Sequence, residues 1–138
     1  MMSTVTKRLL VLATFVVSTS SVVQAAGLDA IQGAWTLSGT CSETFKKVGS
    51  KMRFRDRSSN LSTGVIIDGK KIEGSNMSCT AAKVRETGKG DYTIMMNCAS
   101  ALMFDTVSTG FRVISADEFE RFNPGFPEMT FNYRRCKL

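Results

Sequence analysis

The chain has 138 residues, of which 43% are hydrophobic and 9% aromatic, with 18 Lys and Arg, 12 Asp and Glu, and no histidine. Its net charge of +6 is too small for a dedicated nucleic-acid-binding protein, so no nucleic-acid partner is expected. The absence of histidine excludes histidine-based acid–base catalysis and Ser–His or Cys–His nucleophiles, and we expect no enzymatic activity.

Residues 1–26 have the features of a secretory signal peptide. A basic pair, Lys7 and Arg8, precedes an apolar run over residues 9–17, and Ala25 and Ala26 are the small residues that signal peptidase requires. The apolar run is short for a membrane span. We therefore expect cleavage near Ala25 and Ala26 and a periplasmic or secreted protein with no membrane span after cleavage. An uncleaved anchor is the alternative.

Residues 27–138 are long enough for one small domain with a modest core. Without the two basic residues of the leader, the net charge is +4. The four cysteines are Cys41, Cys79, Cys98 and Cys136. An even number in an exported chain indicates two disulfides. Because no C-x-x-C spacing and no histidine occur, neither a metal site nor a cofactor is expected.

The predicted elements of residues 27–138 are short strands separated by turns. The strand-like segments are 34–41, 51–57, 63–74, 78–98, 110–115, 118–122 and 128–136. Asp68-Gly69 and residues 88–91 are turn signals within hairpins, and Pro124 and Pro127 fall in the last loop. Residues 41–50 fit one short helical turn, and residues 100–108 are ambiguous. Regularly spaced strands predict an all-β fold, a small antiparallel up-and-down barrel of about eight strands, with a sandwich as the alternative.

Strand positions favour one disulfide pairing among the three that four cysteines allow. Cys79 and Cys98 flank the turn at 88–90 almost symmetrically, so they would face each other in a hairpin. Simple strand alternation puts Cys79 on one face with Lys83 and Arg85, and a bulge in that strand is the open explanation for this mixed face. Cys41 is predicted in the first strand and Cys136 in the last, which are neighbours in an up-and-down barrel. We therefore predict Cys79–Cys98 and Cys41–Cys136.

The step Gly33-Ala34-Trp35 resembles the Gly-x-Trp entry to the first strand of lipocalin-like (calycin) barrels. The resemblance implies that Trp35 plugs one end of the barrel and that a basic residue of the last strand, Arg134 or Arg135, lies over its ring. The segment "GAWTLSG" is also similar to the start of the secreted inhibitors of alkaline metalloproteases. That resemblance implies an N-terminal tail that enters a protease cleft.

Apolar side chains supply candidates for either a core or a ligand cavity, because a barrel of about eight strands is just wide enough for one small ligand. The candidates are Trp35, Met96, Phe111, Phe131 and Tyr133. A second candidate is a basic strand face that would meet an anionic partner or simply be solvated. It comprises Lys51, Arg53, Arg55 and Arg57.

These features predict a non-catalytic, exported binding protein that holds a small apolar or amphiphilic ligand. The first alternative is an inhibitor of a protease or lysozyme, or another binder of an envelope protein partner, acting through its surface. The second alternative is a structural role in envelope maintenance.

Overall fold

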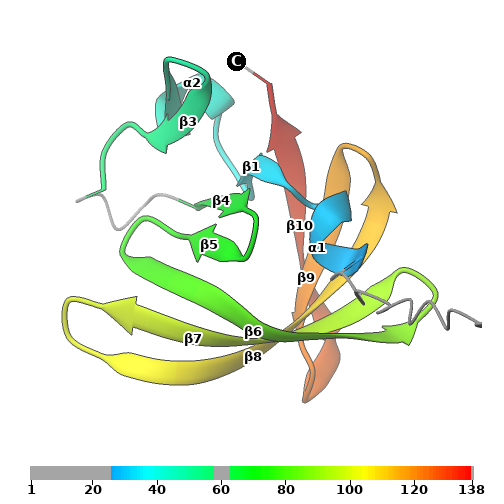
Figure 1. The fold of residues 1–138 in the computed structure, drawn as a ribbon. Coiled ribbons are helices and arrows are strands. Elements are labelled where there is room, and N and C mark those ends of the chain that lie inside the picture. The colour runs from blue at the N-terminus through cyan, green and yellow to red at the C-terminus, as the bar shows by residue number, and fades with distance from the viewer. Residues whose placement is uncertain (1–25, 58–62, 138) are drawn as a thin grey trace, which may run out of the picture.

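Eight antiparallel strands close into a barrel in the computed structural model, which describes residues 26–57 and 63–137 (Figure 1). The order around the barrel is β1-β10-β9-β8-β7-β6-β5-β4, and β4 returns to β1. The strands are β1 (Gly33–Thr36), β4 (Gly64–Asp68), β5 (Lys71–Glu73), β6 (Met77–Gly88), β7 (Asp91–Ser100), β8 (Phe104–Ser115), β9 (Glu118–Asn123) and β10 (Phe126–Cys136). The predicted closed barrel is confirmed, and the expected signal peptide lies outside the described residues except for its last residue.

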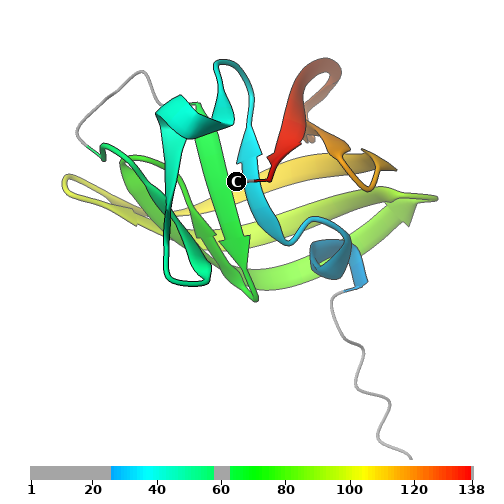
Figure 2. The ribbon, with the colours of Figure 1, turned by 90° about the horizontal axis from the view of Figure 1, so that it is seen from above.

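The segment that connects β1 to β4 along the chain forms a small helix and a hairpin outside the barrel wall (Figure 2). They are α2 (Cys41–Thr44), β2 (Phe45–Val48) and β3 (Lys51–Phe54). The helical turn predicted for residues 41–50 therefore covers only Cys41–Thr44. Phe45 and Phe54 face each other with ring centres 5.2 Å apart and pack with Ala34 and Cys136 on the outer wall. Their burial holds the hairpin against the barrel.

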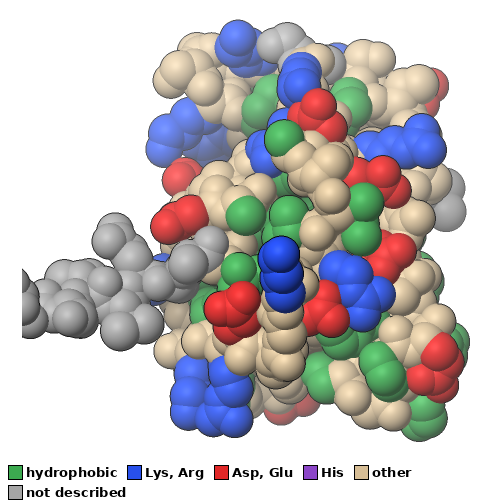
Figure 3. All heavy atoms as spheres, turned by 90° about the vertical axis from the view of Figure 1, so that its right-hand side faces the viewer, with side chains coloured by type: hydrophobic (Ala, Val, Ile, Leu, Met, Phe, Trp, Pro, Cys, Tyr) green, Lys and Arg blue, Asp and Glu red, His purple; other side chains and the backbone are tan. Residues whose placement is uncertain are grey.

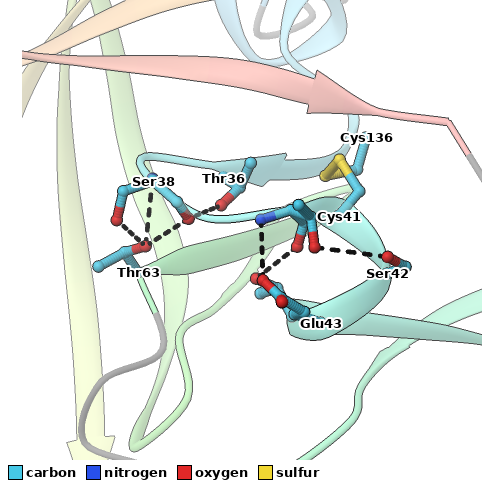
Figure 4. Close-up of a disulfide and its surroundings, with 9 residues drawn as sticks. Thr36, Ser38, Cys41, Ser42, Glu43, Thr63 and Cys136 are labelled. Carbon is cyan, nitrogen blue, oxygen red and sulfur yellow. Dashed lines mark hydrogen bonds between the residues drawn. A yellow bond between two sulfur atoms is a disulfide. The ribbon is translucent and has the colours of Figure 1, made fainter.

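Both predicted disulfides are present, Cys41–Cys136 and Cys79–Cys98. The expectation that Cys41 lies in the first strand is wrong. Figure 4 shows that the chain turns back after β1, so that Cys41, at the start of α2, reaches the end of β10 on the outside of the barrel. In the same view a Ser38–Thr63 hydrogen bond of 3.1 Å braces this turn, and Glu43 accepts a bond of 3.3 Å from the Thr40 backbone amide.

The second disulfide lies inside the barrel, because β6 contains a bulge. Cys79 pairs directly with Cys98, but the register with β7 shifts between Ala81 and Lys83. The extra residue reverses the alternation of β6. Consequently Cys79 and Ala81 face the core, whereas Lys83 is exposed.

One end of the barrel is closed by α1 (Ala26–Ala30) and the residues after it. Leu28 and Ile31 are buried in the core. Trp35 belongs to the same core and is 0% exposed. Arg135 lies opposite Trp35 on β10, and its guanidinium carbon is 4.1 Å from the centre of the tryptophan ring. Of the two basic residues considered for a place over the tryptophan ring, Arg134 and Arg135, it is Arg135 that lies there.

The two prolines have different positions. Pro124 lies in the β9–β10 turn, as expected, but Pro127 belongs to β10 and not to the loop. The pairing of β10 with β9 is interrupted between Phe126 and Thr130. This irregular stretch accommodates a residue that has no backbone N–H to donate.

Candidate functional site

The barrel encloses an apolar cavity of about 420 Å³, within the size range of small-molecule pockets. Inward-facing side chains of β4 to β10 form its wall, and Ile31 forms its floor at the closed end. Typical wall residues are Ile67, Ile72, Ile94, Met96, Val107 and Phe111. The Cys79–Cys98 disulfide also lines the cavity. The interior is therefore partly hollow.

Four of the five predicted cavity residues line this space, namely Met96, Phe111, Phe131 and Tyr133. The fifth, Trp35, lies beneath the cavity, in edge-on contact with Phe119 at 4.8 Å between ring centres. Phe119 stacks on Tyr133 at 5.0 Å. Trp35 thus supports the floor through Phe119 and does not itself form the wall.

A second aromatic stack, Tyr92 on Phe111 at 5.1 Å, adjoins the closed end. Gly27 of α1 lies directly against the Tyr92 ring, because a Cβ at this position would be 2.5 Å from the ring. Glycine therefore lets α1 approach the barrel closely. The Gln32 side chain donates to Gly69 O at 3.1 Å and accepts from Gly69 N at 2.7 Å, which fixes α1 to the β4–β5 turn.

The opposite end of the barrel is the mouth of the cavity, where β6, β8 and β10 begin and β7 and β9 end. Cavity-lining Met77 and Phe131 reach this end. We call the exposed hydrophobic side chains around it the apolar rim: Met77, Leu102, Met103, Phe104, Phe126, Met129 and Phe131. Leu102 is 94% exposed and Phe104 77%. These exposed apolar side chains belong to the β7–β8 turn, the β9–β10 turn and the strand ends beside them, and exposed apolar side chains at a cavity entrance are suited to ligand contact.

The closed end has the opposite character. Figure 3 views the side that carries the β6–β7 and β8–β9 turns, where acidic and basic side chains are intermixed and apolar patches are small. Arg112 donates to both carboxylate oxygens of Asp91, at 2.7 and 3.1 Å, and to Glu120 at 3.1 Å. The hydrogen bonds from Arg112 lower the pKa of Asp91 below its usual value. These ion pairs connect the neighbouring strands β7, β8 and β9 and stabilise the barrel.

The acidic segment 116–120 takes part in ion pairs of the same kind. Asp117 contacts Arg135 at 3.5 Å and Lys137 at 2.9 Å, while Arg135 also donates to Ala116 O at 2.7 Å and to Gln32 O. Arg135 thereby connects the β8–β9 turn to the residues that follow α1.

The predicted basic strand face does not form, because β3 ends at Phe54 and the alternation stops there. Arg55 donates from Nε to the Ser42 carbonyl at 2.9 Å, and Arg57 pairs with Glu73 at 2.6 Å. Lys51 lies 3.8 Å from Asp68. The side-chain hydrogen bond from Lys71 and the pairing with Arg57 lower the pKa of Glu73, although burial opposes the shift.

Arg53, the remaining residue of the predicted basic face, lies beside another basic residue and not beside a carboxylate. It lies opposite Lys46 of β2, and both side chains are exposed. Neither forms an ion pair with any described residue. The two like charges lie directly opposite each other and extend into solvent.

The prediction from sequence missed Arg121, the one charged side chain among the described residues that line the cavity. The segment 118–122 contained a usable signal. Strand alternation places Phe119 and Arg121 on the same face, so an inward Phe119 implies an inward Arg121.

Comparison of the chain with protein-family models, curated proteins and solved structures found no match. The described residues contain no group of three His, Cys, Asp or Glu side chains arranged to hold a metal ion. In the same residues, no helix combines the length and the hydropathy needed to cross a membrane.

Proposed function

We propose that this chain is an exported, non-catalytic binding protein that holds a small apolar or amphiphilic ligand inside its barrel. The observation that carries the proposal is the apolar cavity of about 420 Å³, which opens at the apolar rim. A preformed concave apolar site with a few polar groups is the usual form of a small-molecule site. Residues 1–26 support the exported location through their leader-like sequence.

The lipocalin-like resemblance belongs to this proposal. It is supported by the Trp35–Arg135 stack at the closed end of an eight-stranded antiparallel barrel. A barrel closed at one end and open at the other leaves its interior accessible from a single direction. The apolar rim gives that entrance a surface suited to the apolar part of a ligand.

The test compares two neighbouring methionines of β7. Met96 faces the cavity and is buried, whereas Met95 faces outward and is 41% exposed. Met96→Trp fills the cavity, while Met95→Trp places the same ring in solvent. Binding of the fluorescent probe N-phenyl-1-naphthylamine is measured by titration, and thermal unfolding of each variant shows whether it is folded.

We expect Met96→Trp to reduce probe affinity about tenfold or more and Met95→Trp to leave it unchanged. Val107→Phe, at another cavity-lining position, provides a smaller filling change if Met96→Trp fails to fold. Equal affinity in all folded variants would place the probe outside the barrel and contradict the proposal.

The hairpin supports a second candidate, binding of a protein partner such as a protease or lysozyme through an acidic patch on that partner. Its outward face presents Lys46 and Arg53 with no carboxylate partner among the described residues. The N-terminal segment gives this candidate less support, because Leu28 and Ile31 are buried in the barrel. Inhibition assays and a pull-down with Lys46→Gln/Arg53→Gln, beside Lys83→Gln/Arg85→Gln as the charge-matched control, test it. Failure of the wild-type chain to inhibit or to retain any partner would reject this candidate.

A further inference from the structure

Arg121 of β9 lies on the cavity wall toward the mouth. It is directly opposite Phe131 of β10 and Phe111 of β8, and both phenylalanines line the cavity. Directly opposed residues share a face of the sheet, so Arg121 lies on the inner face with them, and its side chain is exposed to solvent at the entrance. Its guanidinium carbon is 5.5 Å from the centre of the Phe131 ring and 5.7 Å from that of Tyr133. The two rings hold the cation at the entrance to an apolar space.

The charge of Arg121 is not neutralised within the described part of the chain. Arg57, Arg112 and Arg135 each contact a carboxylate, whereas Arg121 has neither an ion pair nor a hydrogen bond among the described residues. Within the described part of the chain, its guanidinium contacts the two aromatic rings. All five N–H donors of its guanidinium are therefore available to a ligand.

The surroundings of Arg121 determine which ligand would use these donors. Asn123, two residues further along β9, also lines the cavity, and its side-chain oxygen already accepts a bond from Gly125 N at 2.9 Å, which leaves its amide group as a donor. No carboxylate lines the cavity among the described residues. The site thus offers donors and positive charge beside apolar walls.

We propose that the cavity takes an anionic amphiphile, whose hydrocarbon chain fills the barrel and whose carboxylate or phosphate head binds Arg121. This inference rests on the proposed binding function. A planar guanidinium matches both head groups through paired hydrogen bonds. A neutral ligand that covered Arg121 would remove water from an unpaired cation without compensation, so the site discriminates against it.

The test uses three probes with the same hydrocarbon chain, dodecanoate, dodecyl phosphate and dodecanol. The two anions are kept below their micellar concentrations and dodecanol below its solubility limit. Their affinities are measured by calorimetry for the wild-type chain and for Arg121→Gln. We expect the wild-type chain to prefer at least one anion over dodecanol, and Arg121→Gln to weaken that anion about tenfold or more. Dodecanol affinity is expected to stay unchanged. The anion that loses more affinity identifies the head group.

Arg85→Gln is the matched control. Arg85 is exposed on β6 and does not line the cavity, so this variant removes one positive charge away from the site. We expect it to bind all three probes as the wild type does. Equal weakening of the anions by Arg85→Gln would indicate general charge attraction and overturn the assignment of Arg121.

The outcomes separate this inference from the proposed function. If dodecanol binds but neither anion is preferred, or if Arg121→Gln leaves anion affinity unchanged, the Arg121 site is rejected and the apolar cavity function stands. If none of the three probes binds, the proposed function fails and the Arg121 site fails with it.

Discussion

The guanidinium carbon of Arg135 lies 4.1 Å from the centre of the Trp35 ring, at the direct cross-strand position between the last and first strands of the barrel. The indole N–H of Trp35 donates to the Ile31 carbonyl at 2.9 Å. Arg135 also donates to carbonyl oxygens of Ala30, Gln32 and Ala116. This pair therefore joins α1, β1, β10 and the β8–β9 turn at the closed end, and the floor of the cavity depends on it.

Loss of the Trp35 side chain is expected to destabilise the barrel strongly. Trp35 is completely buried against Phe119, so Trp35→Ala leaves a large void and should lower the free energy of unfolding by about 3–5 kcal/mol. Denaturant unfolding measures this change. Phe104→Ala, which truncates a 77% exposed ring, is the control and should change stability little. A small loss for Trp35→Ala would contradict its role beneath the cavity.

Removal of the Arg135 charge tests the stack itself. Arg135→Met keeps most of the aliphatic stem but removes the cation and its hydrogen bonds, so we expect a loss of about 1–3 kcal/mol in denaturant unfolding. Arg134→Met removes the same charge from the adjacent, exposed position and should change stability by less than about 0.5 kcal/mol. Equal effects of the two substitutions would show that the cation over Trp35 contributes nothing specific.

The two disulfides are expected to differ in their contributions to stability. Cys41–Cys136 closes a chain separation of 95 residues, whereas Cys79–Cys98 closes one of 19. In the loop-entropy account, replacing both members of the first pair with alanine should cost about 4–5 kcal/mol, and of the second about 3 kcal/mol. Denaturant unfolding of the two double variants shows which disulfide contributes more to the free energy of unfolding. A larger loss for the Cys79–Cys98 pair would contradict this account.

Acid should weaken the ion pair between Asp91 and Arg112. The pKa of Asp91 is lowered in the folded chain by its hydrogen bonds with Arg112. A lowered folded pKa means that the stabilisation is present above the ordinary carboxyl pKa, about 4, and is lost as the pH falls through the folded value. Asp91→Asn should therefore lower the melting temperature at neutral pH and flatten its decline in acid.

The control for this experiment is Glu128→Gln, which removes an exposed carboxylate on β10 that has no ion pair with a described residue. Melting temperatures from about pH 7 to pH 3 are compared for the three chains. If the decline in acid is as steep for Asp91→Asn as for the other two, the Asp91–Arg112 pair does not account for it.

Most of the barrel could be predicted from local sequence signals. The Asp68-Gly69 and 88–91 turns specify two hairpins. The mixed strand face around Cys79 left a bulge as an open explanation, and the structure has one in β6 between Ala81 and Lys83. The Cys41–Cys136 pairing was predicted correctly, although the prediction placed Cys41 in the first strand and the structure places it in α2. These signals are local or follow directly from topology.

The remaining features depend on contacts between distant segments, which local patterns do not specify. The basic residues after Lys51 read as one continuous strand face, but Phe54 ends β3 because it packs against Phe45 on the outer wall. Cys41 lies outside the first strand, at the start of α2, which directly precedes the same hairpin. Strand alternation from Phe119 indicated the inner face for Arg121, but its position beside Phe111 and Phe131 follows only from the pairing of β9 with β8 and β10.

The central claim, that a ligand enters the barrel, is tested most directly by methyl NMR of the chain labelled at methionine and titrated with dodecanol. Met96 lines the cavity wall, Met77 lies at its mouth, and Met95 faces outward from the same strand as Met96. We predict saturable shifts of the Met96 and Met77 methyl resonances with no change at Met95. Saturable binding that leaves Met96 unmoved, or no binding at all, would contradict the account.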